Sequence, residues 1–561
     1  MSTNTANTLV AGVEVKVAGA MLDPKLQDRL VEVRVEDNLT LPDTFELRIS
    51  DPDLTVVDTS PFEVGAPVTI SFAGKAANAL KPVLEGEVTS LEPEFGKDAV
   101  LVVRGYDLSH RLGRKRTVRT FQQVTYADAA KKVITENGLG AGKVDSAGGV
   151  HPFIQQNNQT DWEFLWHLAR RIDFEVVVEG RKCHFRKAST KVPGPTLTWG
   201  DTLRSFRPRV TGVQQVSQVE VGGWDPKSKQ KIVGLASVAE RSAKIGMVVD
   251  GLAQKLSGGL MKLANVPVDS QGDATELAKS VLARLANSSI EATGVAEGDP
   301  DLRAGTTVKV DGVGTKFGGE YKLTSTTHLY RTASGYETRF TIGGRSPRNL
   351  VDLMNRSRPK SFGNSVVVGI VTNTNDPEQL GRVRVKFPEL SDQDESFWAR
   401  VVVPNAGKQR GIYMMPQVGD EVVVAFLHDQ PEYPYILGSV FNGKDTPGPD
   451  LAKQDGSYGV RSPKDIVSDA KEKVLFTCKD FTVETTQHIV HKATGDHTIT
   501  AQGKNAQKST GPTEVEGMTV KVKGSASVTV EAGASLTLKG ATIDISASGP
   551  VNIKGALINI G

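Results

Sequence analysis

Three histidines and one cysteine lie near one another in the C-terminal part of this 561-residue chain, and their types are those of metal ligands. They are His488, His491, His497 and Cys478. Zinc prefers imidazole and thiolate ligands, and threefold symmetry in an assembly would bring copies of an inward histidine to one axis. The spacing, however, matches no zinc-finger signature. We therefore predict no metal site and interpret the histidines as part of a solvated strand face.

Two other motifs contain residue types found in phosphate-binding and calcium-binding loops, but they lack the residues that those loops require around them. Gly138-Leu-Gly-Ala-Gly-Lys143 resembles a phosphate loop, but Val144 follows the lysine where Ser or Thr is needed. Asp392-Gln-Asp394-Glu395 has neither the glycine nor the distal glutamate of an EF-hand. The sequence contains no Gly-x-Ser-x-Gly and no His-Glu-x-x-His. We predict a turn and an exposed loop, no catalytic residues, no cofactor and no enzyme activity.

The composition favours several β-rich domains. At about 100–200 residues per domain the length predicts about three to five domains, and 56 glycines with 6% aromatic residues favour turn-rich β structure. The 67 Lys and Arg residues nearly balance 65 Asp and Glu, so no global field attracts nucleic acid, and two cysteines exclude a disulfide scaffold. The N-terminus resembles no signal peptide, so we expect synthesis and assembly in the cytoplasm.

Period-2 alternation and capping residues predict the elements of the N-terminal region. Helices are predicted at 126–137 and 161–171, capped by Thr125 and Thr160, and at 274–286. The predicted strands are 13–17, 31–35, 68–72, 100–104, 174–178, 307–310, 320–326 and 336–342. The polar stretch 351–364 is interpreted as a domain boundary.

Residues 365–443 hold five short, closely spaced strands, which is typical of a small barrel such as an OB-fold. Trp398 and Phe426 are predicted to lie in its core. The strands are predicted at 366–371, 381–387, 399–403, 421–426 and 436–441. Residues 444–460, which are rich in Pro and Gly, are interpreted as a second linker.

The C-terminus repeats with a period of 16 residues. Residues 517–532 align with 533–548, and 549–561 form a shortened third copy. Each copy holds apolar-polar-apolar triplets, which are Val520-Lys-Val522, Val528-Thr-Val530, Leu536-Thr-Leu538, Ile543-Asp-Ile545, Val551-Asn-Ile553 and Ile558-Asn-Ile560. A fixed period of this kind indicates a β-helix or solenoid.

Such short strands cannot hold their shape alone. Ordering costs roughly 1–2 kcal/mol per residue, whereas burying two Val or Ile side chains returns only about 3–6 kcal/mol. Three chains wound around one axis would share a core, so we predict an intertwined trimer rather than a single-chain array of hairpins. The predicted trimer core consists of Val520, Val522, Val528, Val530, Leu536, Leu538, Ile543, Ile545, Ile553, Ile558 and Ile560.

Residues 366–443 resemble the OB domain of VgrG-type spike proteins of contractile injection systems. The segments that carry this resemblance are Gly369–Pro388, Asp394–Val401, Pro416–Phe426 and Pro434–Gly443. Gln155–Arg171 and Leu302–Gly344 resemble parts of the hub domain of that family.

The resemblance implies a mainly β protein in four parts: a hub of two small β-barrels with short helices at 1–360, an OB-fold at 361–443, a linker at 444–460 and a triple-stranded intertwined β-helix at 461–561. It also implies a homotrimer that joins a hexameric inner tube and baseplate proteins to a PAAR-type tip protein. The tip protein would dock on Ala556, Leu557, Ile558, Asn559, Ile560 and Gly561.

On this interpretation the protein is the central spike that helps puncture a target membrane when a sheath contracts, with effector cargo as a possible further partner. The compact tail favours an extracellular or phage-tail-like particle over a type VI secretion spike. A particle-borne wall hydrolase and a fibrous adhesin remain as alternatives. The first requires an unassigned domain with paired acidic residues, and the second requires exposed aromatic residues on the rod, which 517–561 lacks.

Overall fold

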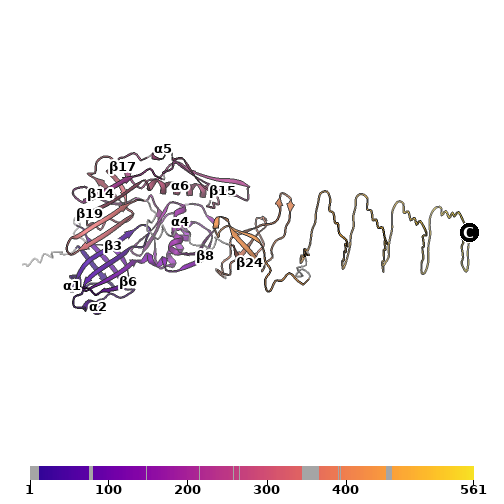
Figure 1. The fold of residues 1–561 in the computed structure, drawn as a ribbon, viewed down its shortest axis with the longest axis horizontal. Coiled ribbons are helices and arrows are strands. Elements are labelled where there is room, and N and C mark those ends of the chain that lie inside the picture. Colours follow the sequence, from indigo (N-terminus) through magenta and orange to yellow (C-terminus); the bar gives the residue numbers. More distant parts are fainter. Residues whose placement is uncertain are drawn as a thin grey trace, which may run out of the picture. The chain divides into compact units, whose positions relative to one another are not determined.

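The computed structural model describes residues 12–74, 80–146, 148–213, 215–249, 251–256, 258–264, 266–343, 366–389, 391, 393–449, 456 and 458–561. The chain forms two compact units, Met1–Gly459 and Val460–Gly561 (Figure 1). The predicted boundary at 360/361 and part of the predicted linker 444–460 lie outside the described residues, so the four-part division stays a prediction.

An 11-stranded antiparallel sheet dominates the hub, a name used here for described residues 12–343. Its strand order is β14-β19-β23-β22-β3-β4-β7-β6-β5-β1-β2. In chain order the strands are β1 (Val13–Val17), β2 (Ala20–Met21), β3 (Leu30–Asn38), β4 (Thr44–Ser50), β5 (Pro67–Ala73), β6 (Leu80–Glu94), β7 (Val100–Asp107), β14 (Leu203–Val210), β19 (Ile290–Glu297), β22 (Ser325–Arg331) and β23 (Gly335–Ile342). Two short helices, α1 (Pro24–Gln27) and α2 (Thr55–Thr59), follow β2 and β4.

Two separate hydrophobic cores lie along this sheet. Alternate residues of β1 and β3–β7, such as Val35, Leu47 and Ile70, form the first core. The second core contains Tyr321 and Phe340 and involves a four-stranded sheet of order β13-β20-β21-β17. The strands of that sheet are β13 (Val192–Thr198), β17 (Lys244–Ile245), β20 (Thr306–Asp311) and β21 (Gly319–Lys322).

A third core surrounds the two predicted helices. Thr125 and Thr160 each form a capping box, in which the threonine hydroxyl accepts from the backbone N–H three residues on and that residue's carboxylate accepts in return. The elements of this part are the 3-10 helix η1 (Leu108–Gly113), β8 (Arg116–Val124), α3 (Tyr126–Glu136), β9 (Gly140–Val144), β10 (His151–Thr160), α4 (Asp161–Arg171), β11 (Phe174–Glu179) and β12 (Lys182–Lys187). Phe164 and Leu165 of α4 are fully buried in this core.

A fourth layer packs the third predicted helix against a small sheet of order β16-β15-β18. Ala274 and Leu277 of the helix face Val219 and Val221 of the sheet. The elements are β15 (Gln218–Asp225), β16 (Gln230–Ala236), α5 (Leu252–Lys255), β18 (Leu260–Leu263) and α6 (Gln271–Asn287).

The five strands after residue 366 close into a barrel of order β24-β25-β26-β30-β29. Alternate side chains from every strand, including Val383, Val424 and Ile436, fill its interior. The elements are β24 (Val367–Asn373), β25 (Arg382–Lys386), β26 (Ala399–Val401), β27 (Ala406–Gly407), β28 (Arg410–Gly411), β29 (Glu421–Phe426), the 3-10 helix η3 (Leu427–Asp429) and β30 (Pro434–Ser439). The mainly β class and the closed small barrel are therefore confirmed.

Two sequence predictions need correction. The strand predicted at 320–326 is two strands, because the N–H of Leu323 bonds the carbonyl of Thr306 while the N–H of Thr324 turns to Thr341. Phe426 lies in the barrel core as predicted, but Trp398 is only half-buried on the barrel surface. The guanidinium of Arg384 lies 5.0 Å from its ring centroid, which covers the indole without burying it.

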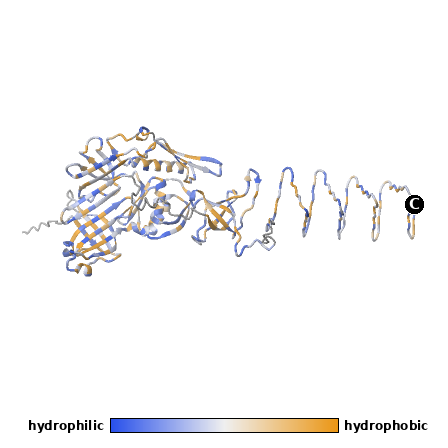
Figure 2. Ribbon diagram, viewed as in Figure 1, coloured by the Kyte–Doolittle hydropathy of each residue, from blue (hydrophilic) through white to orange (hydrophobic). Residues whose placement is uncertain are grey.

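Residues 458–561 contain no helix and no paired strand within the single chain. In Figure 1 the tail, here residues 460–561, runs as one open path of successive turns. Figure 2 shows hydrophobic residues recurring along that path between hydrophilic ones. Among the residues that the structure describes, no helix is both long and apolar enough to cross a membrane.

Candidate functional site

The predicted trimer-core residues of the tail are all exposed in the single chain. Their exposed fractions run from 47% at Ile558 to 90% at Ile560. The residues are Val520, Val522, Val528, Val530, Leu536, Leu538, Ile543, Ile545, Ile553, Ile558 and Ile560. So many exposed large apolar side chains, recurring at regular positions, indicate a surface for association.

The exposure has a simple cause. Each triplet contributes two apolar side chains, and the triplets form no paired strand with one another within the single chain. The backbone N–H and C=O groups of the triplets are consequently unpaired as well, so other strands must satisfy them in any ordered rod. The inward orientation of these side chains in an assembly stays a prediction.

The predicted tip-docking residues lie at the end of this open path. Ala556, Leu557, Ile558, Asn559, Ile560 and Gly561 are all exposed, and Leu557 has an exposed fraction of 79%. Docking of another protein on them stays a prediction.

Aromatic rings form two stacked pairs nearer the start of the tail. The ring centroids of Phe476 and Phe481 are 5.6 Å apart, and those of His491 and His497 are 5.9 Å apart. Within the part of the chain that the structure describes, no group of three or more His, Cys, Asp or Glu side chains could hold a metal ion. The pairing of His491 with His497 was not foreseen from their spacing.

The barrel is seated on the hub through contacts that combine apolar and polar groups. The rings of Phe153 and Phe397 are 5.7 Å apart. The hydroxyl of Tyr433 donates to Oδ1 of Asp269 at 2.6 Å, and the hydroxyl of Thr120 donates to Oδ1 of Asp394 at 3.0 Å. We call this contact surface the junction.

Buried charge gives the junction an unusual electrostatic character. Burial raises the pKa of Glu432 to about 7, although the positive charge of Arg171 opposes this. The Oε2 atom of Glu432 is buried and has no hydrogen-bond partner among the described residues. Arg171 itself donates to Oδ2 of Asp273 at 3.1 Å and to the carbonyl of Pro267 at 3.0 Å.

Asp269 remains charged in this setting. Burial alone would raise its pKa, but the facing groups of His151 and Tyr433 lower it below the ordinary value. Burial and the nearby Asp269 carboxylate raise the pKa of Tyr433 well above its usual range, so the hydroxyl stays a donor. The junction therefore depends on one ionised carboxylate, Asp269, and one readily protonated one, Glu432.

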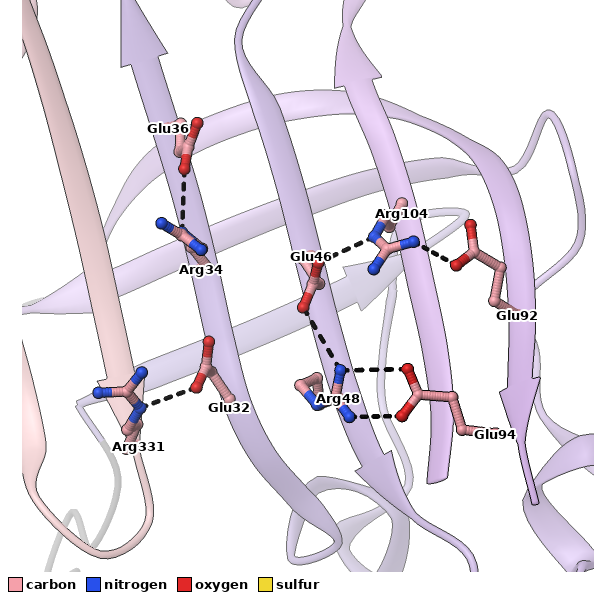
Figure 3. A network of polar contacts seen from close by, with 9 residues as sticks. All are labelled: Glu32, Arg34, Glu36, Glu46, Arg48, Glu92, Glu94, Arg104 and Arg331. Atoms are coloured by element: carbon pink, nitrogen blue, oxygen red, sulfur yellow. Dashed lines mark hydrogen bonds and ion pairs between the residues drawn. The ribbon is translucent and has the colours of Figure 1, made fainter. Parts of the chain in front are cut away.

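Paired charges cover the solvent face of the hub sheet from β22 to β6. Figure 3 shows nine of them: Glu32, Arg34, Glu36, Glu46, Arg48, Glu92, Glu94, Arg104 and Arg331. Their neighbours in sequence point into the first core, so alternation along each strand places the charges outside. Glu46 illustrates the pattern, since its carboxylate lies 2.8 Å from Nε of Arg104 and 3.7 Å from Nη1 of Arg48. Opposite charges across strands favour this register.

The structure also locates parts of the two remaining sequence motifs. Gly138, with φ of 72°, ends α3 and leads into β9, as a turn should. Asp392 lies outside the described residues, and Asp394 uses its carboxylate to accept hydrogen bonds from Thr120 and Ser391. The carboxylate of Asp394 is therefore part of the junction, whereas the sequence predicted that it would lie in an exposed loop.

Two family profiles match the first compact unit, one over the hub and one over the barrel. Residues 7–331 match the family profile described as the Alg8 N-terminal domain. Residues 367–441 match the profile described as the type VI secretion system/phage-baseplate injector OB domain.

Curated relatives share a short part of the chain. The type VI secretion system spike protein VgrG1a of Pseudomonas aeruginosa is 35% identical over 102 residues, which is 18% of this chain and 16% of that protein. The spike protein VgrG3 of Vibrio cholerae is 38% identical over 73 residues, 12% of this chain and 7% of that protein. The chain thus matches less than a fifth of the length of these relatives.

Among solved structures, the E. coli c3393 protein, described as a component of the type VI secretion system, superposes with a TM-score of 0.47. It is 14% identical, and the match covers 76% of this chain and 99% of that one. The profile match over 7–331 covers more than half of the sequence. The chain therefore belongs to the family of the Alg8 N-terminal domain, and its OB domain is similar to that of the VgrG spike proteins.

Proposed function

We propose that this protein is the central spike of a contractile injection apparatus, most suited to an extracellular or phage-tail-like particle. It would join a hexameric inner tube and the baseplate to a membrane-piercing tip and help puncture the target envelope when the sheath contracts. A spike of a type VI secretion system is the alternative within the same class.

One observation carries the proposal. An injector OB domain, packed firmly on a hub, is followed by a repeat whose apolar residues stay exposed in a single chain. Further chains would cover these side chains, and three identical tails wound around one axis would give them a shared core. A wound rod has paired strand edges along its length and is stiff, which is what a piercing element needs.

The partners follow from the same argument. A homotrimer would bury the eleven triplet residues on its axis, and residues 556–561 would offer unpaired backbone for a PAAR-type tip protein. Effector cargo is an optional further partner. The assembly would form in the cytoplasm of the producing cell and leave it with the particle.

The role is mechanical and not enzymatic. The curated relatives named above are described as spike proteins. One further relative is described as the actin cross-linking toxin VgrG1 of Vibrio cholerae, and the match to it covers only 7% of that protein. A wall hydrolase would need a further catalytic domain with paired acidic residues in a cleft.

Native mass spectrometry of the purified full-length chain tests the proposal. We expect a mass of three chains that persists in mild detergent, and electron micrographs with a narrow rod. A variant ending at Gly459, the limit of the first compact unit, should lose the rod in micrographs. A stable monomeric full-length protein would refute the proposal.

A further inference from the structure

The junction buries polar atoms without pairing all of them. Four buried atoms have no hydrogen-bond partner among the described residues, and they are Nε2 of His151, Oε1 of Gln155, Nε of Arg171 and Oε2 of Glu432. Glu432 belongs to the barrel and the other three residues belong to the hub, so unpaired atoms lie on both sides of the contact. Buried polar groups are nearly always paired, because an unpaired group loses its bonds to water. The junction thus retains polar groups that water would satisfy if the barrel moved away.

More carboxylates than cations surround Glu432. Arg171 ends α4, Asp269 lies in the loop before α6, and Asp273 lies in the first turn of α6. The guanidinium of Arg171 already donates to Asp273 at 3.1 Å, and the hydroxyl of Tyr433 donates to Asp269 at 2.6 Å. An ionised Glu432 would add a third carboxylate beside the guanidinium of Arg171.

The other titratable groups of the junction do not correct this excess. They are Tyr126 of α3, His151 of β10 and Tyr433, which follows Glu432 in sequence. Burial raises the pKa of both tyrosines, so their hydroxyls stay neutral. The ring of His151 stacks on that of Tyr126 with centroids 4.0 Å apart, and its Nδ1 lies 4.0 Å from Oδ2 of Asp269. The imidazole therefore lies beside a carboxylate that already needs it.

A proton on Glu432 would match the barrel to the hub surface. A protonated carboxyl is neutral and donates through its O–H, whereas an ionised one only accepts. The backbone N–H of Gln155 bonds the carboxyl of Glu432, and the side chain of the same glutamine offers Oε1 as an acceptor without a described partner. Burial accordingly raises the pKa of Glu432 to about 7. The neutral carboxyl fits this surface better than the carboxylate does.

We propose that Glu432 is a proton-dependent latch, which seats the barrel on the hub when it is protonated and releases the barrel as a folded unit when it is ionised. Release need not unfold the barrel, because the buried residues of its core all come from residues 367–436. The latch belongs to the single chain and does not require the proposed trimer.

The dependence on pH follows from linkage. The pKa of Glu432 is about 7 in the seated state and should return to its ordinary 4.5 when the released barrel exposes the carboxyl to water. Seating is therefore strongest below about pH 4.5 and weakens as the pH rises through 7. Between pH 6 and 8 the equilibrium constant for seating should fall about tenfold.

Hydrogen exchange of the full-length chain at pH 6 and pH 8 tests the latch, because exchange reports an open state even when it is rarely populated. The amide of Gln155 is the direct reporter, since its partner is Glu432 itself. After correction for the intrinsic effect of pH on exchange, we expect its protection to be about tenfold lower at pH 8. Amides of β24 and β29 in the barrel should keep their protection at both pH values.

Matched variants assign the effect to one carboxyl. Glu432→Gln is neutral throughout, so the protection of Gln155 should be the same at pH 6 and 8. Glu389→Gln, at an exposed carboxyl of the barrel, should keep the tenfold change of the wild type.

Two results would overturn the latch. One is wild-type protection at Gln155 that does not change with pH, a result that needs no variant to fold. The other is an equal loss of protection in β24 and β29, which would mean unfolding of the barrel instead of release. A monomer in native mass spectrometry would overturn the proposed function and leave the latch unaffected.

Discussion

The barrel and the tail use the same alternation of Val and Ile with polar residues, yet only the barrel is complete in one chain. In β24–β30 the strands return beside one another, and residues such as Val383, Val424 and Ile436 are fully buried. In the tail the triplets succeed one another along an open path, and Val520 or Ile545 remain more than half exposed. Alternation therefore decides which side chains share a face, whereas closure of the sheet decides whether one chain can bury that face.

The largest effect is expected when a charge is placed on the predicted axis of the trimeric tail. Leu538→Asp would put three carboxylates on the axis of the predicted trimer, at a cost of several kcal/mol each. We expect loss of the trimer in native mass spectrometry and a large fall in its melting temperature. Thr537→Asp, one residue away on the outer face, is the control. Unchanged melting of the Leu538→Asp trimer would contradict the inward orientation.

Substitutions that create a cavity should distinguish the barrel, which closes within one chain, from the tail, which we expect to close between chains. Ile436→Ala removes a fully buried side chain from the barrel and should cost about 2–5 kcal/mol of unfolding free energy. This loss should not depend on protein concentration, because the barrel closes within one chain. Ile545→Ala in the tail should lower a melting temperature that rises with concentration. Calorimetry over a dilution series measures both melting temperatures. If they depended equally on protein concentration, the barrel and the tail would not differ in how they close.

The junction should make the stability of the barrel depend on pH. The pKa of Glu432 is raised from its ordinary 4.5 to about 7. The stabilisation is therefore fully present below about pH 4.5 and is lost as the pH rises through 7, by at most about 3 kcal/mol. Glu432→Gln stays neutral at every pH, so it should reduce the change in melting temperature between pH 5 and 8. Glu378→Gln, at an exposed ion pair with Lys227, should leave the slope unchanged.

Removing one hydrogen bond at the junction should have a smaller effect. Tyr433→Phe deletes the donor to Asp269 and should cost about 2 kcal/mol, since hydrogen bonds to charged groups contribute about 1.5–3 kcal/mol. Limited proteolysis between hub and barrel should become faster, while trimer formation by the tail is retained. Equal proteolysis rates for Tyr433→Phe and the wild type would show that this bond does not hold the barrel.

The smallest effect on folding is expected at the end of the tail. Deleting Ala556–Gly561 removes only the final triplet, so the trimer should persist with a melting temperature within a few degrees of the wild type. Binding of a PAAR-type tip protein, measured by co-purification, should be lost. Co-purification that survives the deletion would place the docking surface elsewhere.

Local signals made much of the fold predictable from sequence. Thr125 and Thr160 fix the starts of α3 and α4 through contacts within three residues, and strict alternation locates strands such as Val13–Val17 and Glu421–Phe426. The junction was not predictable in this way. Tyr433 and Asp269 are 164 positions apart, and nothing near either residue indicates the other.

The errors have the same origin. Trp398 was predicted in the core, but it neighbours the fully buried Ala399 and so lies on the other face of the strand, where Arg382 and Arg384 of β25 cover its ring. In the tail, spacing excluded a zinc-finger pattern, but only the structure showed that the rings of His491 and His497 lie together. Contacts between distant or repeated segments carry information that a window of neighbouring residues lacks.

The direct seating of the barrel on the hub has a mechanical consequence. Phe153 against Phe397 and Tyr433 against Asp269 join the two parts through side chains, independently of residues 344–365. An axial thrust applied to the hub would thus reach the barrel as compression across a packed surface.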